Sequence, residues 1–311
     1  MALCLILQSN FIRMEAQSEA TYTPISLVLN KLKDYSLFFK MRLTFLVVIS
    51  AALGYIIAAE KIIWGELLLL SLGGFLVTGS SNGFNQIWEK NLDALMNRTN
   101  NRPLVTGRMQ KLEALILAIV SGALGISIIW LALNPLAGVL ALLSLFTYVF
   151  IYTPMKQHTP WAVFVGAFPG AIPPMLGWVA ATGHFGLEPG LLFAIQFIWQ
   201  FPHFWAIAWK ANDDYAKAGF HLLPSKNGKD LSSAFLILLY TLFLLLVSLL
   251  PVFFGLVGWI AAVIFVISGI MMIIPAIRLF KDRSDKAATK LMFASFIYIP
   301  LILLAWYIDK L

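Results

Sequence analysis

Nine apolar runs, most of them about as long as a bilayer is thick, restrict what this chain can fold into. A helix needs about 20 apolar residues to cross the hydrocarbon core of a membrane. The runs do not alternate apolar with polar residues, as residues 236–250 (LILLYTLFLLLVSLL) show, so they do not fit the strands of a membrane β-barrel. The sequence therefore predicts an all-α integral membrane protein. Its nine transmembrane helices are expected near residues 43–60, 66–84, 112–132, 136–153, 161–181, 189–209, 231–250, 256–277 and 291–308.

The basic residues predict how these helices are oriented. If the N-terminus is cytoplasmic, 20 of the 22 Lys and Arg residues fall on cytoplasmic segments, and only Lys61 and Lys310 fall outside. Such an excess marks the cytoplasmic side of a membrane protein. We therefore expect a cytoplasmic N-terminus and a C-terminus outside. The net charge of +7 follows from this topology, which argues against a nucleic-acid partner.

The N-terminal segment of the chain contains no candidate catalytic residues. We expect residues 1–34 to form a polar cytoplasmic leader and residues 35–311 to form a single membrane domain. Translation could start at Met1 or at Met14, because the residues after Met14 (EAQSEATYTP) resemble an ordinary polar leader. Cys4 is the only cysteine, so the sequence holds no disulfide framework and no paired-cysteine metal site.

A polar segment directly after the second apolar run has the composition of a metal and phosphate site. Asn85, Glu89 and Asp93 are spaced i, i+4, i+8, which places them along one face of a helix. Carboxylate and amide oxygens suit Mg²⁺, which is commonly completed by substrate phosphates. Arg98 and Arg102 follow, and an arginine side chain can bind phosphate through two hydrogen bonds. The alternative is a solvated loop whose arginines only mark the cytoplasmic side.

A second polar loop, after the sixth apolar run, carries another acidic pair. Asp213 and Asp214 are adjacent, and Lys210 precedes Asp214 by one helical turn. Carboxylates on two facing loops could hold two Mg²⁺ ions and clamp one diphosphate between them. The alternative is an interfacial acidic pair that Lys210 and Lys217 neutralise.

Together the two loops are typical of a site that ionises an allylic diphosphate. A metal ion and arginines draw charge onto the leaving diphosphate, and aromatic rings can shield the resulting carbocation from water. The aromatic residues expected near this face are Trp88, Tyr148, Tyr152, Trp161, Phe164, Trp199, Phe204 and Trp205. Aromatic residues at this depth also form ordinary interfacial belts.

The segment 166–178 (GAFPGAIPPMLGW) is either a packing kink or a helix opened around a bulky ligand.

Three stretches of the sequence resemble a known family. Residues 85–103 (NQIWEKNLDALMNRTNNRP) are similar to the first Asp-rich motif of the UbiA superfamily of intramembrane prenyltransferases. Their pattern D-x-x-M-x-R-T-x-x-R-P resembles the protohaem IX farnesyltransferases, also called haem O synthases. Residues 152–183 and 199–224, which include WQFPHFW and DDYAKAGFHLLP, are similar to further motifs of that family. The resemblance runs from about residue 35 to the end of the chain.

The resemblance implies a nine-helix bundle of the UbiA prenyltransferase type in the bacterial inner membrane, with a lateral opening to lipid. It implies Mg²⁺ as cofactor, and farnesyl diphosphate and haem b as substrates that yield haem O and diphosphate. Haem A synthase and oxidase assembly proteins are candidate protein partners. By motif, the metal and catalytic residues are Asn85, Glu89, Asp93 and Asp214, with Asp213 beside them as a further catalytic candidate. The matching substrate-binding residues are Arg98, Arg102, Lys156 and Tyr215.

The chain departs from the family pattern at two positions. Glu89 stands where Asp is frequent, which keeps the charge and adds one methylene. Lys210 occupies the first position of the D-x-x-x-D pattern of the second loop, so a full second Mg²⁺ site is in doubt and Lys210 could contact diphosphate directly.

The acceptor site has the weakest signal. His203, in the FPHFW stretch, is the best candidate for a haem contact, because His is a common axial ligand of haem iron. A hydrogen-bonded core histidine is the alternative. Two rival functions remain open at this point: a UbiA-type enzyme that prenylates an aromatic quinone precursor, and an ion-coupled transporter. A transporter would place its charges near the bilayer midplane, whereas almost all charges of this chain lie at one face.

Overall fold

The computed structural model describes residues 24–225 and 227–311, and their regular secondary structure is helical apart from an isolated β-bridge between Val257 and Lys310. The two candidate start residues Met1 and Met14, and the lone Cys4, lie outside the described residues. Nine helices in the described part are long and apolar enough to cross a membrane, so the predicted number is confirmed. They span Met41–Ala58, Trp64–Trp88, Lys111–Ala132, Pro135–Met155, Ala162–Thr182, Leu187–Lys210, Leu231–Phe253, Trp259–Asp282 and Asp285–Ile308.

Most of these spans are single helices, and two are composite. The single ones are α3 (Met41–Ala58), α4 (Trp64–Trp88), α6 (Lys111–Ala132), α9 (Ala162–Thr182), α10 (Leu187–Lys210), α14 (Trp259–Asp282) and α15 (Asp285–Ile308). The fourth span joins α7 (Pro135–Phe146), the π-helix η1 (Thr147–Tyr152) and α8 (Thr153–Met155). The seventh joins α12 (Leu231–Ser248) and α13 (Leu250–Phe253).

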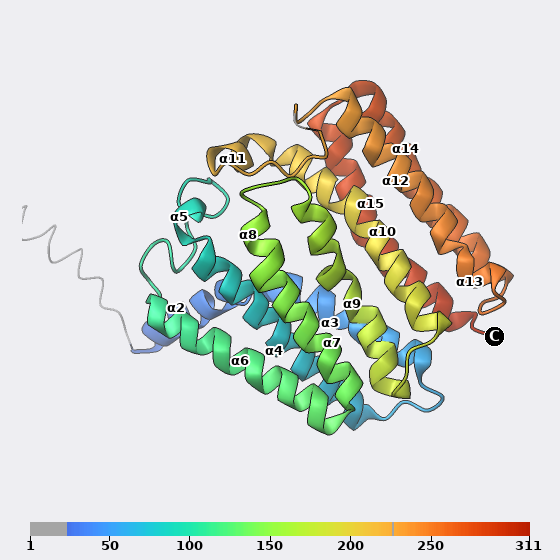
Figure 1. Ribbon diagram of the computed structural model, residues 1–311, viewed down its shortest axis with the longest axis horizontal. Coiled ribbons are helices and arrows are strands. Elements are labelled where there is room, and N and C mark those ends of the chain that lie inside the picture. The colour runs from blue at the N-terminus through green and yellow to red at the C-terminus, as the bar shows by residue number, and fades with distance from the viewer. Residues whose placement is uncertain (1–23, 226) are drawn as a thin grey trace, which may run out of the picture.

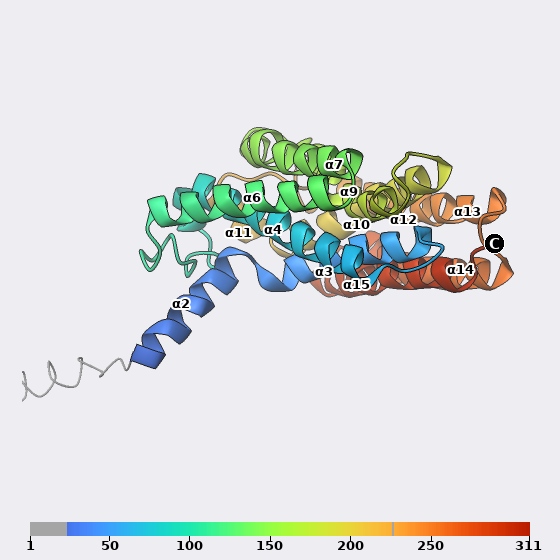
Figure 2. The same cartoon turned by 90° about the horizontal axis from the view of Figure 1, so that it is seen from below.

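The helices lie side by side in a flat bundle, and the two polar loops meet at one end of it (Figure 1, Figure 2). The first loop contains the short helix α5 (Lys90–Asp93) and the second contains α11 (Asn212–Lys217). We call this end of the bundle the polar end. Helix α2 (Pro24–Phe38) begins at the same end and projects away from the bundle (Figure 2). The predicted boundary at residue 34 between leader and membrane domain falls inside α2.

Side chains of neighbouring helices satisfy two of the carbonyls that the prolines of the continuous helix α9 release. A proline has no N–H to donate to the carbonyl four residues before it. Pro173 thereby frees the carbonyl of Pro169, which accepts from Ser144 Oγ at 3.3 Å. Pro174 frees the carbonyl of Gly170, which accepts from Gln200 Nε2 at 3.0 Å. The segment is thus a packed helix pinned by α7 and α10.

The glycines of α9 and α3 allow these two helices to touch through their backbones. A Cβ on Gly54 would lie 2.0 Å from the carbonyl oxygen of Pro174, and a Cβ on Gly177 would lie 1.9 Å from that of Ala51. Small residues commonly permit such close approach between membrane helices. The contact holds α3 and α9 together through their C-terminal halves.

We expect Gly177→Ala to destabilise the protein by at least about 2 kcal/mol, because the added methyl group would meet backbone atoms that cannot move aside alone. The thermal unfolding midpoint in detergent measures this effect. Gly65→Ala is the matched control, since Gly65 also lies in a membrane helix and a Cβ there meets nothing within 4 Å. Equal midpoints for the two variants would contradict the close approach of α3 and α9.

Candidate active site

The first polar motif forms one face of a helix, as the spacing predicts. The backbone N–H of Glu89 donates to Asn85 O at 2.9 Å, and that of Asp93 donates to Glu89 O at 2.8 Å, so the helical turn continues from α4 into α5. Asn85, Glu89 and Asp93 therefore stack along one side. All three side chains are buried, with at most 3% of their surface exposed. Two buried carboxylates one turn apart require positive charge nearby.

Three basic residues from three different parts of the chain supply that charge. Lys156 Nζ lies 2.7 Å from Glu89 Oε1. Arg102 pairs with Asp93 Oδ2. Lys40 Nζ donates to Asn85 Oδ1 at 3.3 Å. The three basic groups outnumber the two carboxylates, so the cluster gains a net positive charge whenever Lys40 is protonated, and it suits a bound anion.

Lys40 is the site residue that the sequence analysis missed. It stands directly before α3 in a left-handed backbone conformation (φ 46°, ψ 55°), which is uncommon for a residue other than glycine. Burial lowers the pKa of Lys40 well below its usual value, and the nearby charges of Arg102 and Lys156 lower it further. In the sequence, Lys40 is one basic residue among many at the start of an apolar run. Only its backbone conformation and its neighbours distinguish it.

The two carboxylates differ in how well they are neutralised. Burial alone would lower the pKa of Lys156, but the adjacent Glu89 outweighs burial and raises it, so the ammonium group of Lys156 stays charged. Burial raises the pKa of Asp93, although Arg102 opposes the rise. Asp93 Oδ1 and Asn85 Nδ2 are buried and have no hydrogen-bond partner among the described residues. A bound divalent cation would satisfy Asp93 Oδ1, so the donor set of hard oxygens fits Mg²⁺.

The second loop contacts the first loop through Asp214. Its Oδ1 accepts from the N–H of Asn97 at 2.8 Å, and its Oδ2 accepts from the N–H of Arg98 at 3.1 Å. Lys217 Nζ also lies 3.1 Å from Oδ1. Burial alone would raise the pKa of Asp214, but these donors outweigh burial and lower it. Both carboxylate oxygens are therefore occupied by bonds that join the loops.

The other residues predicted on the second loop lie around this contact. The guanidinium of Arg98 lies over the ring of Tyr215, 5.4 Å from its centroid. The side chain of Asp213 is 88% exposed, and its nearest basic group is Lys229 Nζ at 4.0 Å. Lys210 is exposed at the end of α10. In the described part of the chain, no three His, Cys, Asp or Glu side chains lie close enough together to hold a metal ion among them, and both oxygens of Asp214 are occupied, so metal binding by Asp214 stays a prediction.

We expect Asp214→Ala to release the first loop. Without the carboxylate, the amides of Asn97 and Arg98 lose their acceptor and should exchange with solvent at least about tenfold faster, since one lost hydrogen bond to a charged group costs about 1.5–3 kcal/mol. Hydrogen–deuterium exchange of residues 94–102 measures this. Because the folded pKa of Asp214 is depressed, the protection in the native protein is present above the ordinary carboxyl pKa and is lost as the pH falls through the lowered value. Unchanged exchange would contradict the contact between the loops.

Two predicted aromatic residues adjoin the charged cluster. Tyr148 and Tyr152 lie in the π-helix η1, with ring centroids 5.0 Å apart. Lys156 Nζ lies 4.7 Å from the centroid of the Tyr152 ring. Single π-helical turns inside α-helices often occur at functional sites. The extra residue in this turn brings both tyrosines and Lys156 to the side of Glu89.

His203 lies in the seam between α10 and α15. Ser295 Oγ donates to the carbonyl of Met292 at 2.6 Å, and His203 Nδ1 lies 2.8 Å from the same Oγ. The serine proton is thus already used, so Nδ1 carries a proton and donates it, and Nε2 keeps its lone pair. The ring stacks on Trp199 at 4.3 Å. These bonds are those of a well-fixed core histidine, and a haem contact through it stays a prediction.

Comparisons with known proteins identify the family of this chain. A sequence model of the UbiA prenyltransferase family matches residues 47–298. The chain belongs to this family. It is 49% identical to the protoheme IX farnesyltransferase of Christiangramia forsetii over 90% of this chain and 94% of that protein.

Solved structures show the same fold. A digeranylgeranylglyceryl phosphate synthase superimposes with a TM-score of 0.75 at 21% identity, over 90% of this chain and 98% of that one. A UbiA homolog from Archaeoglobus fulgidus bound to GPP and Mg²⁺ superimposes with a TM-score of 0.62 at 13% identity, over 88% of this chain and 99% of that one. The predicted UbiA-type bundle is therefore confirmed, and the protein is a multi-pass membrane prenyltransferase.

Proposed function

We propose that this protein transfers the farnesyl group of farnesyl diphosphate to haem b, with addition of water, to form haem O and diphosphate. The observation that carries the proposal is the buried cluster in which Lys40, Lys156 and Arg102 surround Asn85, Glu89 and Asp93. Its excess of positive charge at the edge of a membrane bundle suits a diphosphate attached to a lipid tail. The identity to protoheme IX farnesyltransferases over nearly the whole chain favours haem b as the acceptor.

Asn85, Glu89 and Asp93 would hold Mg²⁺, with Asp214 as a further candidate ligand and Asp213 beside it. When bound, Mg²⁺ supplies Lewis-acid charge to the diphosphate oxygens. The unpartnered Oδ1 of Asp93 supports this assignment. The A. fulgidus homolog bound to GPP and Mg²⁺ also supports a metal ion beside a prenyl diphosphate in this fold.

The basic residues stabilise the leaving group as the allylic C–O bond breaks. The electron pair of that bond goes to the diphosphate, whose growing charge Lys40, Lys156 and Arg102 meet from three sides. Arg98, Tyr215 and Lys210 lie on the two loops that would cover the diphosphate from the polar end. Because Lys156 and Arg102 are held by ion pairs and Lys40 by a hydrogen bond to Asn85 before substrate arrives, little reorganisation is needed during ionisation.

Tyr148 and Tyr152 protect the farnesyl cation from premature capture by water. Their rings are neighbours, and that of Tyr152 lies beside Lys156, so both would be close to the carbon that loses diphosphate. The electron-rich faces of such rings stabilise a neighbouring cation. A haem vinyl carbon then bonds to that carbon, and water adds to the resulting cation with loss of one proton. His203, whose Nε2 keeps its lone pair, is the candidate haem contact.

The distribution of basic residues supports a cytoplasmic polar end, in the inner membrane of a bacterium. Substrates would then meet at the cytoplasmic face, and haem A synthase or oxidase assembly proteins would receive the product. A quinone-precursor prenyltransferase is the second candidate, because it would use the same metal and diphosphate chemistry. An ion-coupled transporter is excluded by membership of a prenyltransferase family.

The test is a turnover assay with the purified protein. Incubation with haem b, farnesyl diphosphate and Mg²⁺ should yield a haem that carries a hydroxyethylfarnesyl side chain, detected by mass spectrometry. We expect EDTA to reduce the rate at least about a hundredfold, since the metal provides several kcal/mol of charge stabilisation, and added Mg²⁺ to restore it. Prenylation of 4-hydroxybenzoate without any haem product would move the acceptor to the quinone class. Full activity in EDTA would overturn the metal assignment.

A further inference from the structure

Helix α2 presents an apolar stripe that the rest of the described chain leaves uncovered. Ile25, Val28, Leu29 and Leu32 follow the spacing i, i+3, i+4, i+7, which places them along one face of the helix. Their side chains are between 57% and 72% exposed. The helix projects away from the bundle at the polar end, so this face does not pack against the membrane spans (Figure 2).

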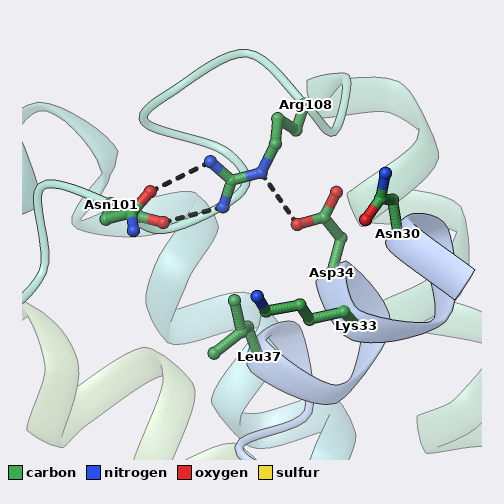
Figure 3. A pocket seen from close by; sticks show the side chains of 6 residues that line it. All are labelled: Asn30, Lys33, Asp34, Leu37, Asn101 and Arg108. Atoms are coloured by element: carbon green, nitrogen blue, oxygen red, sulfur yellow. Dashed lines mark hydrogen bonds and ion pairs between the residues drawn. The ribbon is translucent and has the colours of Figure 1, made fainter. Parts of the chain in front are cut away.

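The opposite side of α2 carries the exposed Leu27 and polar side chains that the first loop and the start of α6 hold. Asp34, about half a turn round the helix from the stripe, accepts from Arg108 Nε at 2.8 Å. Arg108 also donates to the backbone and side-chain oxygens of Asn101 at 2.8 and 3.0 Å (Figure 3). Lys31 and Tyr35 both reach Glu113, at 2.8 and 3.0 Å. These bonds fix the rotation of α2, so the apolar stripe must point away from the loop.

Two observations identify what the stripe contacts. The stripe is followed directly along the chain by the surface of a membrane span, because α3 begins three residues after α2 ends. The exposed apolar side chains on this part of α3, which a membrane span turns toward lipid, are Leu43, Phe45, Leu46 and Ile49. Lysines border the stripe on both sides: Lys31 on one side pairs with Glu113, and Lys33 on the other lines the pocket beside Asp34 (Figure 3) and has no ion-pair partner among the described residues. An apolar stripe bordered by lysines is the pattern of a helix that lies in the headgroup region of an anionic membrane.

We propose that α2 is a membrane-surface helix, with Ile25, Val28, Leu29 and Leu32 in the acyl-chain boundary of the leaflet at the polar end and Lys33 among anionic headgroups. Its polar face would then hold the loop that carries Arg98 and Arg102 at a constant height above the bilayer. The inference is independent of which acceptor the enzyme prenylates.

Collision measurements on spin labels test this placement in the full-length protein. Cys4→Ser provides the background, Leu29→Cys places a nitroxide on the stripe, and Asn30→Cys places the matched label on the polar face. Both positions are exposed, so the labels should not disturb the fold. The proteins are reconstituted in nanodiscs of phosphatidylcholine and phosphatidylglycerol. Collision rates with oxygen, which partitions into lipid, and with a water-soluble nickel chelate are compared.

We expect the ratio of oxygen to nickel collisions to be several-fold higher at Leu29 than at Asn30. The ratio at Leu29 should fall when phosphatidylglycerol is omitted or when Lys33→Glu is introduced. Equal nickel access at both positions would place α2 in water and overturn the proposal. Protection of Leu29 from both reagents would mean that protein covers the stripe, whether a second copy or residues of this chain, and would overturn it as well. A ratio insensitive to phosphatidylglycerol and to Lys33→Glu would refute the role of anionic headgroups.

Discussion

Asp93→Asn is expected to reduce the rate of prenyl transfer by about a hundredfold to a thousandfold, the usual effect of removing one group that stabilises developing charge. The substitution keeps the shape of the side chain and removes its negative charge. In the native protein Asp93 forms a buried ion pair with Arg102, and the amide of the variant cannot neutralise that arginine. It also replaces a carboxylate oxygen, the preferred ligand of Mg²⁺, by a weaker one. The expected result is therefore a much lower kcat together with a raised Mg²⁺ requirement.

The measurement is the turnover assay at several Mg²⁺ concentrations. Asp282→Asn is the matched control, because it makes the same chemical change at an exposed position on the last turn of α14, at the same end of the bundle. An unchanged elution profile and thermal midpoint would show that Asp93→Asn still folds. Near-normal turnover by a folded Asp93→Asn protein would remove the buried cluster from the reaction.

The second large effect concerns the buried pair of Lys156 and Glu89, where we expect substitutions to change the stability of the protein and its rate of prenyl transfer independently. Lys156→Met leaves the Glu89 carboxylate buried without its ammonium partner, and we expect a loss of about 3–5 kcal/mol in the free energy of unfolding. Adding Glu89→Gln removes the unpaired charge. The double variant should recover most of that stability, because replacing both members of a buried pair is often nearly neutral.

Activity should not return with stability. The double variant lacks one of the three basic residues around the proposed diphosphate site and one of the proposed carboxylate ligands, so its rate should stay at least about a hundredfold below that of the native protein. Thermal midpoints and turnover of the native protein, the two single variants and the double variant complete the cycle. If the double variant regained activity as well, the pair would be structural and would play no part in catalysis.

Much of the architecture follows from the sequence because membrane helices are encoded locally. A run of about 20 apolar residues satisfies its own backbone hydrogen bonds and can hardly be anything but a helix in lipid, so all nine spans were predicted and are confirmed. The stacking of Asn85, Glu89 and Asp93 was predictable for the same reason. Helical periodicity places residues four apart on one face whatever the rest of the fold does.

Only the tertiary structure decides which distant groups meet that face. Lys40 reaches Asn85 across 45 residues, and Lys156 reaches Glu89 from the end of another membrane span. Hydropathy and helical spacing distinguish neither lysine from the other basic residues at the same end of the bundle, and the family motifs point to Lys156 but not to Lys40. Asp214, a candidate metal ligand by motif, uses both carboxylate oxygens to hold the backbone of Asn97 and Arg98. The sequence by itself therefore determined the membrane helices and the alignment of the acidic side chains, because these depend on local hydropathy and helical spacing. Which basic side chains meet the acidic ones depends on how the helices pack, and that packing is a property of the whole bundle.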